Sequence, residues 1–324
     1  MTDIQQLLLP VADEMKACRK QLDAFMSHSN PLLNEVLSGI AQHKGKMLRP
    51  LLTMLAAKLF APVSQETLFT ALTFEFFHTA TLVHDDVVDE SDERRGTPSV
   101  NSAYANKVAV LVGDYILATA LHTTEQSGSI ALLGIVSKAA QILVDGELLQ
   151  LRSVHNREIS EEVYFHIIKG KTAALFEACA QAGALSVGAS ADDAENLRRF
   201  GENIGICFQI KDDIFDYMTG ADIGKPTGND MREGKLTLPV IYALKSTGNE
   251  EMKALAYKVK DGVATAGEIE RLVAFTLENG GIEYAIQTME RYAEEARRLL
   301  DRYTDSGVKT ALLHFIEYVI DRTY

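Results

Sequence analysis

The chain carries two short aspartate clusters of the same form, DDVVD at 85–89 and DDIFD at 212–216. Each cluster ends a long apolar run and precedes a turn-rich stretch. Because residues i and i+4 project from one face of a helix, we expect Asp85 beside Asp89 and Asp212 beside Asp216. Such stacked like charges repel one another near a helix C-terminus by roughly a few tenths of a kcal/mol. A multivalent cation would reverse that sign, so the fold must bring both clusters to one metal site.

The predicted metal is Mg²⁺. Carboxylates without accompanying Cys or paired His suit a hard, oxygen-preferring ion, which makes Zn²⁺ the poorer candidate. Mg²⁺ usually takes one or two protein carboxylates and completes its shell with water and substrate phosphate oxygens, so phosphorylated substrates are implied. The alternative is that each cluster is a solvated helix end, and the matched pair favours the metal. The candidate ligands are Asp85, Asp86, Asp89, Asp212, Asp213 and Asp216.

The rest of the chain predicts an all-α fold. Hydrophobic residues make up 47% of the 324 residues, and strand-like alternation between tight turns is hard to find. Because the two clusters must meet, and no long polar linker separates them, we expect a single domain over 1–324. Helices are expected at 3–29, 31–43, 46–60, 65–92, 99–125, 128–152, 160–187, 190–219, 235–247, 249–260, 266–279, 281–303 and 305–322.

Charge and cysteine content restrict the class of protein. A net charge of −13 makes nucleic-acid binding an unfavourable reading, because duplex recognition normally uses a basic face. Cys18, Cys179 and Cys207 are widely spaced and lack a CxxC pair, which favours reduced, buried thiols. The first residues do not resemble a secretory signal, and no apolar run is long enough to span a membrane. These features predict a cytoplasmic protein.

Basic residues gather at a few turn-rich places in this acidic chain, where anionic substrates could bind. Arg binds phosphate oxygens in a bidentate manner, and Lys offers a point charge, so two diphosphates would suit such a lining. For a single lysine, surface solvation is the competing explanation. The residues concerned are Lys46, Arg49, Arg94, Arg95, Lys171, Lys225 and Lys235.

These motifs resemble the trans-isoprenyl diphosphate synthases, a family of head-to-tail polyprenyl transferases. The resemblance covers HKGKMLRP (43–50), FFHTATLVHDDVVDESDERRGTPS (76–99), DGELLQL (145–151), KGKTAALF (169–176) and GICFQIKDDIFDYMTGADIGKPTGNDMREGKLTLPV (205–240). It implies an antiparallel helix bundle around a deep central cavity, the isoprenoid synthase fold. It also implies about three Mg²⁺ ions that bridge the acid motifs to an allylic diphosphate, farnesyl or geranylgeranyl, which then reacts with isopentenyl diphosphate.

The resemblance also implies roles for individual residues. Asp85, Asp89 and Asp212 would be metal ligands, while Asp86, Asp213 and Asp216 would tune the site or hold metal-bound water. The allylic diphosphate would be held by Arg94, Lys171, Lys225 and Lys235. Isopentenyl diphosphate would be held by Lys46, Arg49, His78 and Arg95. Thr172 and Gln209 would lie near the reacting carbons, and the roles of Glu147 and Gln150 stay open. For His78 the competing reading is a satisfied core histidine.

The helix that enters the first acid motif predicts the product length. Short-chain members of the family close the tunnel with an aromatic residue four or five positions before the first aspartate, where this chain has Thr81 and Ala80. The hydrocarbon would then pass until Phe77 or Phe74, or a residue near Leu143 and Val144, stops it. Because helical residues rise by ~1.5 Å each, Phe77 and Phe74 lie further along the tunnel than Thr81 and Ala80 and leave room for a longer hydrocarbon. We therefore expect a long-chain product of about C30 to C50.

Other readings remain open from the sequence. A shorter-chain farnesyl or geranylgeranyl diphosphate synthase has the same motifs, a class I terpene cyclase shares the ionisation step, and a subunit of a heteromeric synthase shares the fold. The presence of all six aspartates and a DDIFD second motif favours the synthase. The family usually forms homodimers, so we expect one here, with transient membrane contact for release of the hydrophobic product.

Overall fold

The computed structural model describes residues 4–43, 45–155, 158–218 and 227–322. Most of them are helical. The elements are α1 (Ile4–Leu8), η1 (Leu9–Val11), α2 (Ala12–Phe25), α3 (Pro31–Gln42), α4 (Leu48–Lys58), α5 (Gln65–Val88), β1 (Glu93–Arg94), β2 (Thr97–Pro98), α6 (Val100–Tyr104), α7 (Asn106–Gln126), α8 (Ile130–His155), α9 (Glu161–Ile168), η2 (Lys169–Ala173), α10 (Ala174–Leu185), α11 (Ala191–Phe215), α12 (Asn229–Arg232), α13 (Leu238–Thr247), α14 (Glu250–Lys260), α15 (Ala266–Glu278), α16 (Gly281–Leu300) and α17 (Gly307–Asp321).

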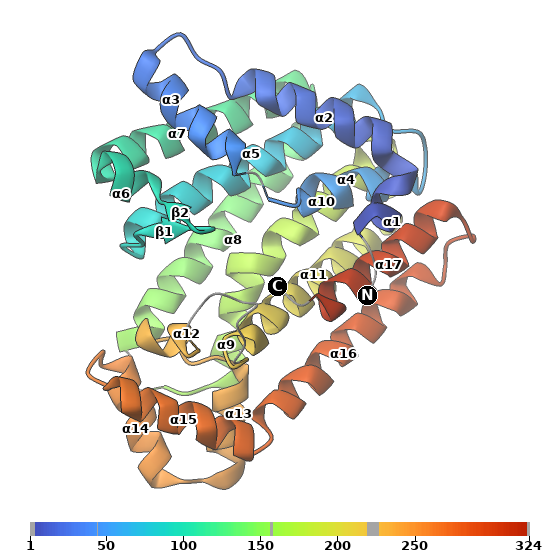
Figure 1. Ribbon diagram of the computed structural model, residues 1–324. Helices are drawn as coiled ribbons and strands as arrows, with labels where there is room; N and C mark the ends of the chain where they lie inside the picture. The colour runs from blue at the N-terminus through green and yellow to red at the C-terminus, as the bar shows by residue number, and fades with distance from the viewer. Residues whose placement is uncertain (1–3, 44, 156–157, 219–226, 323–324) are drawn as a thin grey trace.

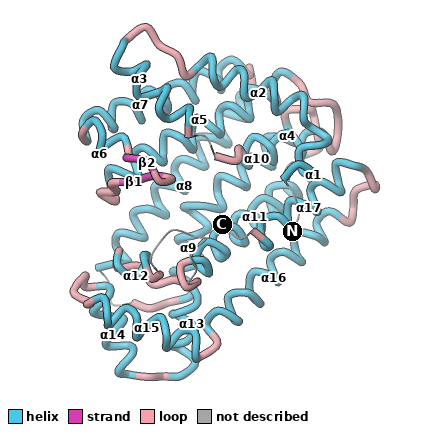
Figure 2. The backbone as a smooth tube through the Cα atoms, in the orientation of Figure 1, coloured by secondary structure: helices cyan, strands magenta, loops and turns pink. Residues whose placement is uncertain are grey.

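Long helices form the centre of the molecule (Figure 1). Helix α10 packs against α4, α5, α8 and α11, and α11 also contacts α16 and α17. The N-terminal helices α2 and α3 cover one end, whereas α13, α14 and α15 lie at the opposite end (Figures 1 and 2). This arrangement confirms the predicted all-α fold.

The two helices that carry the aspartate motifs start at defined caps. Ser64 accepts the N–H of Thr67 at the start of α5, and Thr67 returns a bond to the N–H of Ser64, which completes a capping box. Ser190 accepts the N–H of Asp193 at the start of α11. Both helices end within their acid motif, at Val88 and Phe215. The third aspartate of each motif is therefore a C-terminal cap residue.

The observed helices differ from the expected ones at a few local breaks. A 3-10 turn at Leu9–Val11 interrupts the helix expected at 3–29, next to Pro10. Ala105, with φ of 75°, separates α6 from α7 within the range expected as one helix. Helix α4 begins at Leu48, which puts Pro50 in the first turn, where a missing N–H costs nothing.

A short β-hairpin, absent from the helices expected by sequence, follows the first acid motif. Arg94 pairs with Thr97, and the two residues between them, Arg95 and Gly96, both have positive φ, of 54° and 74°. Positive φ at both central positions is typical of the tight turns that match strand twist. Helix α5 therefore ends four residues before the end expected at 92, and the hairpin folds Arg94 back toward the motif.

Candidate active site

The first aspartate motif presents its acids in different environments. Asp85 is partly buried on the last turn of α5, and burial, with further contributions from Glu147 and Asp89, raises the pKa of its carboxyl to about 6. The Lys171 ammonium opposes that shift. Within the described ranges no hydrogen bond or ion pair is recorded for the Asp85 carboxylate. Its side chain is therefore available for a ligand.

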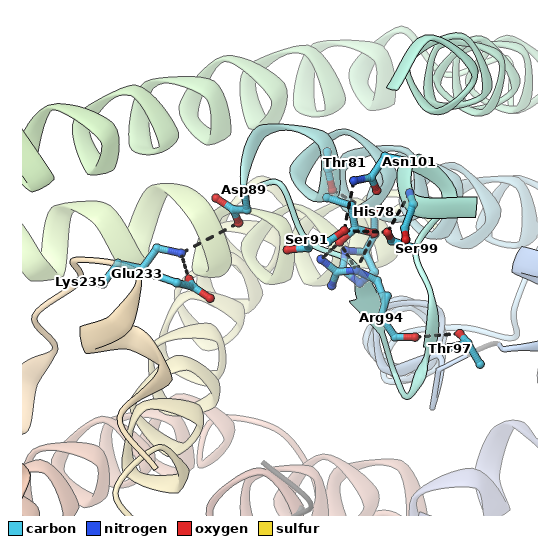
Figure 3. Close-up of polar contacts among 12 residues, drawn as sticks. His78, Thr81, Asp89, Ser91, Arg94, Thr97, Ser99, Asn101, Glu233 and Lys235 are labelled. Carbon is cyan, nitrogen blue, oxygen red and sulfur yellow. Dashed lines mark hydrogen bonds and ion pairs between the residues drawn. The ribbon is translucent and has the colours of Figure 1, made fainter. Parts of the chain in front are cut away.

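Asp86 is bound instead by the hairpin arginine. It is 2% exposed, and Arg94 donates to it from Nε at 2.8 and 3.0 Å and from Nη2 at 2.6 Å. This bidentate contact is the strongest geometry available to a carboxylate and an arginine. Figure 3 shows the Arg94 side chain together with Ser91, Thr97 and Ser99, in the segment that follows α5. The contact positions Arg94 beside the motif, as the sequence predicted, but with its guanidinium already paired.

The second motif is tied into a hydrogen-bonded chain. Buried Asp213 accepts bonds from the Tyr164 hydroxyl at 2.6 Å and from Gln209 Nε2 at 2.9 Å. Thr172 Oγ1 donates to Gln209 Oε1 at 2.6 Å. Burial nevertheless raises the pKa of Asp213, with Asp212 adding to the shift. The contacts bring together Thr172, Gln209 and Asp213, all of which the sequence placed in the site.

Asp216 caps a small helix. Its carboxylate accepts the N–H groups of Asn229 at 2.8 Å and Asp230 at 3.2 Å, at the start of α12. The half-buried Asp230 side chain lies within electrostatic range of Asp213 and Asp216, and burial, followed by these two negative charges, raises the pKa of Asp230 well above its ordinary value. Sequence reasoning missed Asp230. Its position in the polar run after the second motif was the signal that could have found it.

Lys235 connects the end of the first motif with the segment around α12. Its Nζ lies 2.6 Å from Glu233 Oε2 and 3.9 Å from Asp89 Oδ2, so a lysine that follows α12 reaches the end of α5 (Figure 3). The negative charge of Asp230 also acts on it, and its pKa is raised by Glu233 and Asp89 against the effect of burial. The contact places the end of the first motif next to the segment that follows the second.

Lys171 lies in a single π-helical turn, η2, and pairs with Glu147 at 2.7 Å. This turn packs closely on α8: a Cβ added to Gly170 would lie only 3.0 Å from the Gly146 Cα. Only glycine allows so close an approach of two helical backbones. The pair of glycines therefore sets the distance between Lys171 and the Glu147 carboxylate, which gives Glu147 a defined contact. Gln150 donates to the same carboxylate at 3.2 Å.

Arg322, just beyond α17, is a site residue that sequence reasoning missed. Its Nη2 lies 2.8 Å from Asp212 Oδ1 and donates to the Phe208 carbonyl at 2.7 Å, and its guanidinium stacks 3.9 Å from the Phe208 ring centroid. No motif marks an arginine so far along the chain. Its side chain is 10% exposed, so the second motif already carries a buried counter-charge.

The residues predicted for isopentenyl diphosphate surround the start of α4. Arg49 lies 4.9 Å from the Phe176 ring centroid, and its buried Nε has no hydrogen-bond partner among the described residues. Burial, followed by the charges of Arg49, Arg95 and Arg94, lowers the pKa of His78 well below its usual range. Arg95 donates from Nη1 to the His43 carbonyl at 2.8 Å, and Lys46 lies 5.5 Å from the Tyr318 ring. An orphaned arginine donor surrounded by cations suits an anion.

The residues predicted to set chain length are in the core. Phe74, Phe77 and Ala80 are buried, and Thr81 is half-buried with its hydroxyl bonded to the His78 carbonyl. A second region of the site contains a cavity of about 170 Å³ beside the second motif, and its lining includes Lys171, Gln209 and Asp213. None of the four chain-length residues lines it. Their role stays a prediction.

The site as a whole is polar and rich in both charges, but its acids are spread out. In the part of the chain that the structure describes, no three His, Cys, Asp or Glu side chains converge tightly enough to hold a metal by themselves. Lys225, the remaining predicted phosphate ligand, falls outside the described residues. No helix in the described ranges is both long and apolar enough to cross a bilayer.

Known proteins resemble this chain over nearly its whole length. The family model for polyprenyl synthetase matches residues 30–276. Octaprenyl diphosphate synthase of Haemophilus influenzae is 34% identical over 326 residues, which cover 99% of this chain and 97% of that protein. A solved geranylgeranyl pyrophosphate synthase from Bacteroides thetaiotaomicron is 46% identical, has a TM-score of 0.87, and covers 98% of this chain and 99% of its own.

A third relative carries ligands. Polyprenyl synthase from Caulobacter crescentus, solved in complex with calcium and isoprenyl diphosphate, is 31% identical, has a TM-score of 0.92, and covers 100% of this chain and 99% of its own. The family resemblance stated from the sequence motifs is therefore confirmed. The chain belongs to the polyprenyl synthetase family.

Proposed function

We propose that this protein is a trans-prenyltransferase that joins isopentenyl diphosphate head-to-tail to an allylic diphosphate, with Mg²⁺, and releases a long-chain all-trans polyprenyl diphosphate. The observation that supports the proposal is the contact of Lys235 with Asp89, because Lys235 follows the short helix α12, whose first N–H groups are bound by Asp216 of the second motif. The polyprenyl synthetase match and the octaprenyl diphosphate synthase relative support the same reaction.

The acids present fit a hard divalent cation. Asp86, Asp213 and Asp216 are engaged by Arg94, by Tyr164 with Gln209, and by backbone N–H groups. Asp85, Asp89 and Asp212 are the acids predicted to be ligands, and none of the three is buried, although Asp212 pairs with Arg322 and Asp89 lies 3.9 Å from Lys235. Because Mg²⁺ needs few protein ligands and takes the rest from water and phosphate, loosely spaced carboxylates are sufficient. The Caulobacter crescentus relative, solved with calcium and isoprenyl diphosphate, supports an oxygen-liganded cation.

The protein's own residues bind and orient the two substrates. Lys171 and Lys235 offer ammonium groups where the allylic diphosphate is proposed to lie, while Arg49 and Arg95 offer guanidinium groups to isopentenyl diphosphate. Bound Mg²⁺ would neutralise negative charge that grows on the departing diphosphate. Fixed cations around that group stabilise it further as the allylic C–O bond breaks. The isopentenyl double bond then attacks the allylic cation, and a proton is lost to the released diphosphate.

The proposed product is C30 to C50, because Ala80 and Thr81 leave no aromatic barrier just before Asp85, and because octaprenyl diphosphate synthase of Haemophilus influenzae matches 99% of this chain. One observation favours a shorter product. The solved Bacteroides thetaiotaomicron protein, which is 46% identical, is a geranylgeranyl pyrophosphate synthase. A C20 product is therefore the second candidate function.

A homodimer is part of the proposal. Helices α7 and α8 expose apolar side chains that a monomer would leave in water, including Leu111 at 69%, Ile130 at 85% and Leu148 at 60%. Several large exposed apolar side chains on two neighbouring helices are a candidate protein–protein interface. Light scattering of the purified protein is expected to give twice the 35.6 kDa chain mass, and a monomer at micromolar concentration would contradict this part.

The test of the reaction uses farnesyl diphosphate with and without isopentenyl diphosphate. We expect both substrates to be consumed together in Mg²⁺, and chromatography of the dephosphorylated products to show chains of C30 or longer. A sharp C20 product would favour the second candidate. Consumption of farnesyl diphosphate alone, giving a hydrocarbon or alcohol, would contradict the synthase and indicate a cyclase. Inactivity of the pure chain that a second protein restores would indicate a heteromeric subunit.

A further inference from the structure

Lys171, the lysine proposed to hold the allylic diphosphate, is already paired with a carboxylate. Its Nζ lies 2.7 Å from Oε2 of Glu147 and 3.0 Å from Oε1, so both carboxylate oxygens face the ammonium. Gln150, one turn further along α8, donates to the same carboxylate at 3.2 Å. The Glu147 side chain is 14% exposed and that of Lys171 is 24% exposed, so solvent screens the pair only in part.

The backbone fixes the distance between these two side chains. Lys171 belongs to the π-helical turn η2, which meets α8 at a pair of glycines. A Cβ added to Gly146 would lie 3.0 Å from the Lys171 nitrogen, and one added to Gly170 would lie 3.0 Å from the Gly146 Cα. Because the two backbones touch, η2 and α8 cannot move closer or slide past one another without strain. Glu147 therefore stays close to any anion that Lys171 binds.

The other cations beside the aspartate motifs have partners of a different kind. Arg322 lies 2.8 Å from Asp212, and Lys235 lies 3.9 Å from Asp89. Both of these acids are predicted metal ligands, so a bound cation would offset their charge. Glu147 lies on α8 and belongs to neither aspartate motif. Its negative charge therefore opposes its partner lysine whether or not a metal ion is bound.

The charge of Glu147 also acts on the first aspartate motif. Burial raises the pKa of the Asp85 carboxyl to about 6, the Lys171 ammonium opposes that shift, and the negative charges of Glu147 and Asp89 add to it. Glu147 is therefore within electrostatic range of both Lys171 and Asp85, the two groups between which the allylic diphosphate is proposed to lie. Like charges at such short range repel one another strongly in a partly buried site.

We propose that Glu147 is a positioning residue that limits how tightly Lys171 holds a diphosphate, and so promotes release of that group after each condensation. The inference rests on the proposed function, which places the allylic diphosphate at Lys171. Each condensation breaks the allylic C–O bond and leaves inorganic diphosphate at this position, where it must depart before the elongated chain can bind. Glu147 competes with the diphosphate for the ammonium and repels it. Without the carboxylate, substrate and released diphosphate both bind more tightly.

Binding without turnover tests this role directly, by calorimetric titration of inorganic diphosphate into the full chain in EDTA. Only the protein's own cations then hold the anion. Glu147→Gln keeps the size of the side chain and is expected to bind about tenfold more tightly than the wild type. Lys171→Met, combined with Glu147→Gln, is expected to abolish that gain. The control is Glu202→Gln, because Glu202 pairs at 2.9 Å with Lys169 of the same turn, and it is expected to bind like the wild type.

The synthase assay separates this role from a purely structural one. Glu147→Gln is expected to lower both the KM for farnesyl diphosphate and kcat, because a tightly held diphosphate leaves slowly. Inorganic diphosphate is expected to inhibit this variant at about tenfold lower concentration than the wild type. Glu147→Asp keeps the charge and is expected to lie closer to the wild type than to Glu147→Gln. A residue that only braces η2 against α8 would weaken binding when removed and could not strengthen it.

Several results would overturn the inference: no binding of diphosphate in EDTA, equal or weaker binding in Glu147→Gln, a gain that persists in the double variant with Lys171→Met, or an equal gain in Glu202→Gln. The titration needs no catalysis, so a Lys171-dependent gain in a protein without prenyl transfer would contradict only the proposed function. Normal prenyl transfer by a Glu147→Gln variant that shows no gain would contradict only the role of Glu147.

Discussion

Six aspartates of the same type have six different surroundings in this protein. Asp86 and Asp213 are held by neighbouring side chains, Asp216 by backbone N–H groups, and Asp212 by Arg322. Asp85 carries no recorded partner within the described ranges, and burial raises its pKa to about 6. A carboxylate that is costly to ionise without a partner is stabilised when a cation arrives. This difference among identical residues is why Asp85 is the most sensitive test position.

His78 gives a prediction about pH. Burial, followed by the charges of Arg49, Arg95 and Arg94, lowers its pKa. Below pH ~6.5 this histidine is therefore protonated in the unfolded chain but stays neutral in the folded chain. The free energy of unfolding is expected to fall as pH drops, by up to ~1.4 kcal/mol per pH unit from this group. Urea unfolding between pH 7 and 5 measures it. His78→Gln is expected to show a shallower slope, and an identical slope would contradict a depressed pKa.

Arg322 gives a prediction about stability. Arg322→Gln removes the stacking on Phe208 and the bond to the Phe208 carbonyl, which together contribute about 1–3 kcal/mol. Chemical denaturation is expected to show that loss. The control is Arg302→Gln, because Arg302 pairs with Asp192 on the exposed surface, and its loss is expected to cost less than ~1 kcal/mol. Equal effects of the two variants would show that Arg322 does not anchor the segment after α17.

Among the elements, α5 carries both the first acid motif and the predicted elongation face, because Asp85 lies on the same side of the helix as Thr81 and Phe77. Ala80→Tyr tests the elongation face. Ala80 is 1% exposed on the predicted elongation face, so a tyrosine ring there is expected to block the hydrocarbon before it reaches Phe77 and to shorten the products toward C15. Product chromatography measures the shift, with Ala80→Ser as the size control. Unchanged chain length in Ala80→Tyr would remove this account of the tunnel.

The helices were predictable from sequence because each has an apolar face, and several have a capping residue that marks where the helix starts. Ser64, Ser190 and Thr265 mark helix starts, and the structure has α5, α11 and α15 begin at the next residue. The break at Ala105 was not predictable, since alanine favours helix and rarely adopts the positive φ that it has here. The hairpin was missed because strands of two residues are too short to show alternation.

The site was predictable where its residues lie in compact motifs and not where they come from distant helices. The acid clusters and the Arg94–Arg95 pair are adjacent in the sequence. Tyr164 and Arg322 reach Asp213 and Asp212 only through tertiary packing, so no spacing rule reveals them. The pairing of Arg94 with Asp86 is likewise a product of the hairpin turn. The sequence predicted which charges gather, and the structure shows which of them already neutralise each other.

At the scale of the molecule, two hydrophobic cores support the site from different sides. The larger core contains Phe74, Phe77 and Phe176, and the smaller one contains Tyr217, Met231 and helices α13 to α15. Tyr217 directly follows the second motif, and Met231 lies in α12, so the smaller core holds Asp230 and Lys235 in place. That the whole chain is one domain stays a prediction, as does its place in the cytoplasm.

The most direct test of the central claim is the rate of carbon–carbon bond formation from farnesyl and isopentenyl diphosphates, measured with free Mg²⁺ chelated and then restored. The account predicts no turnover in EDTA, full recovery with Mg²⁺, and a loss of about 10²-fold or more in Asp85→Asn at saturating Mg²⁺. Turnover that persists in EDTA, or an Asp85→Asn variant with wild-type activity, would contradict a metal site shared by the two aspartate motifs.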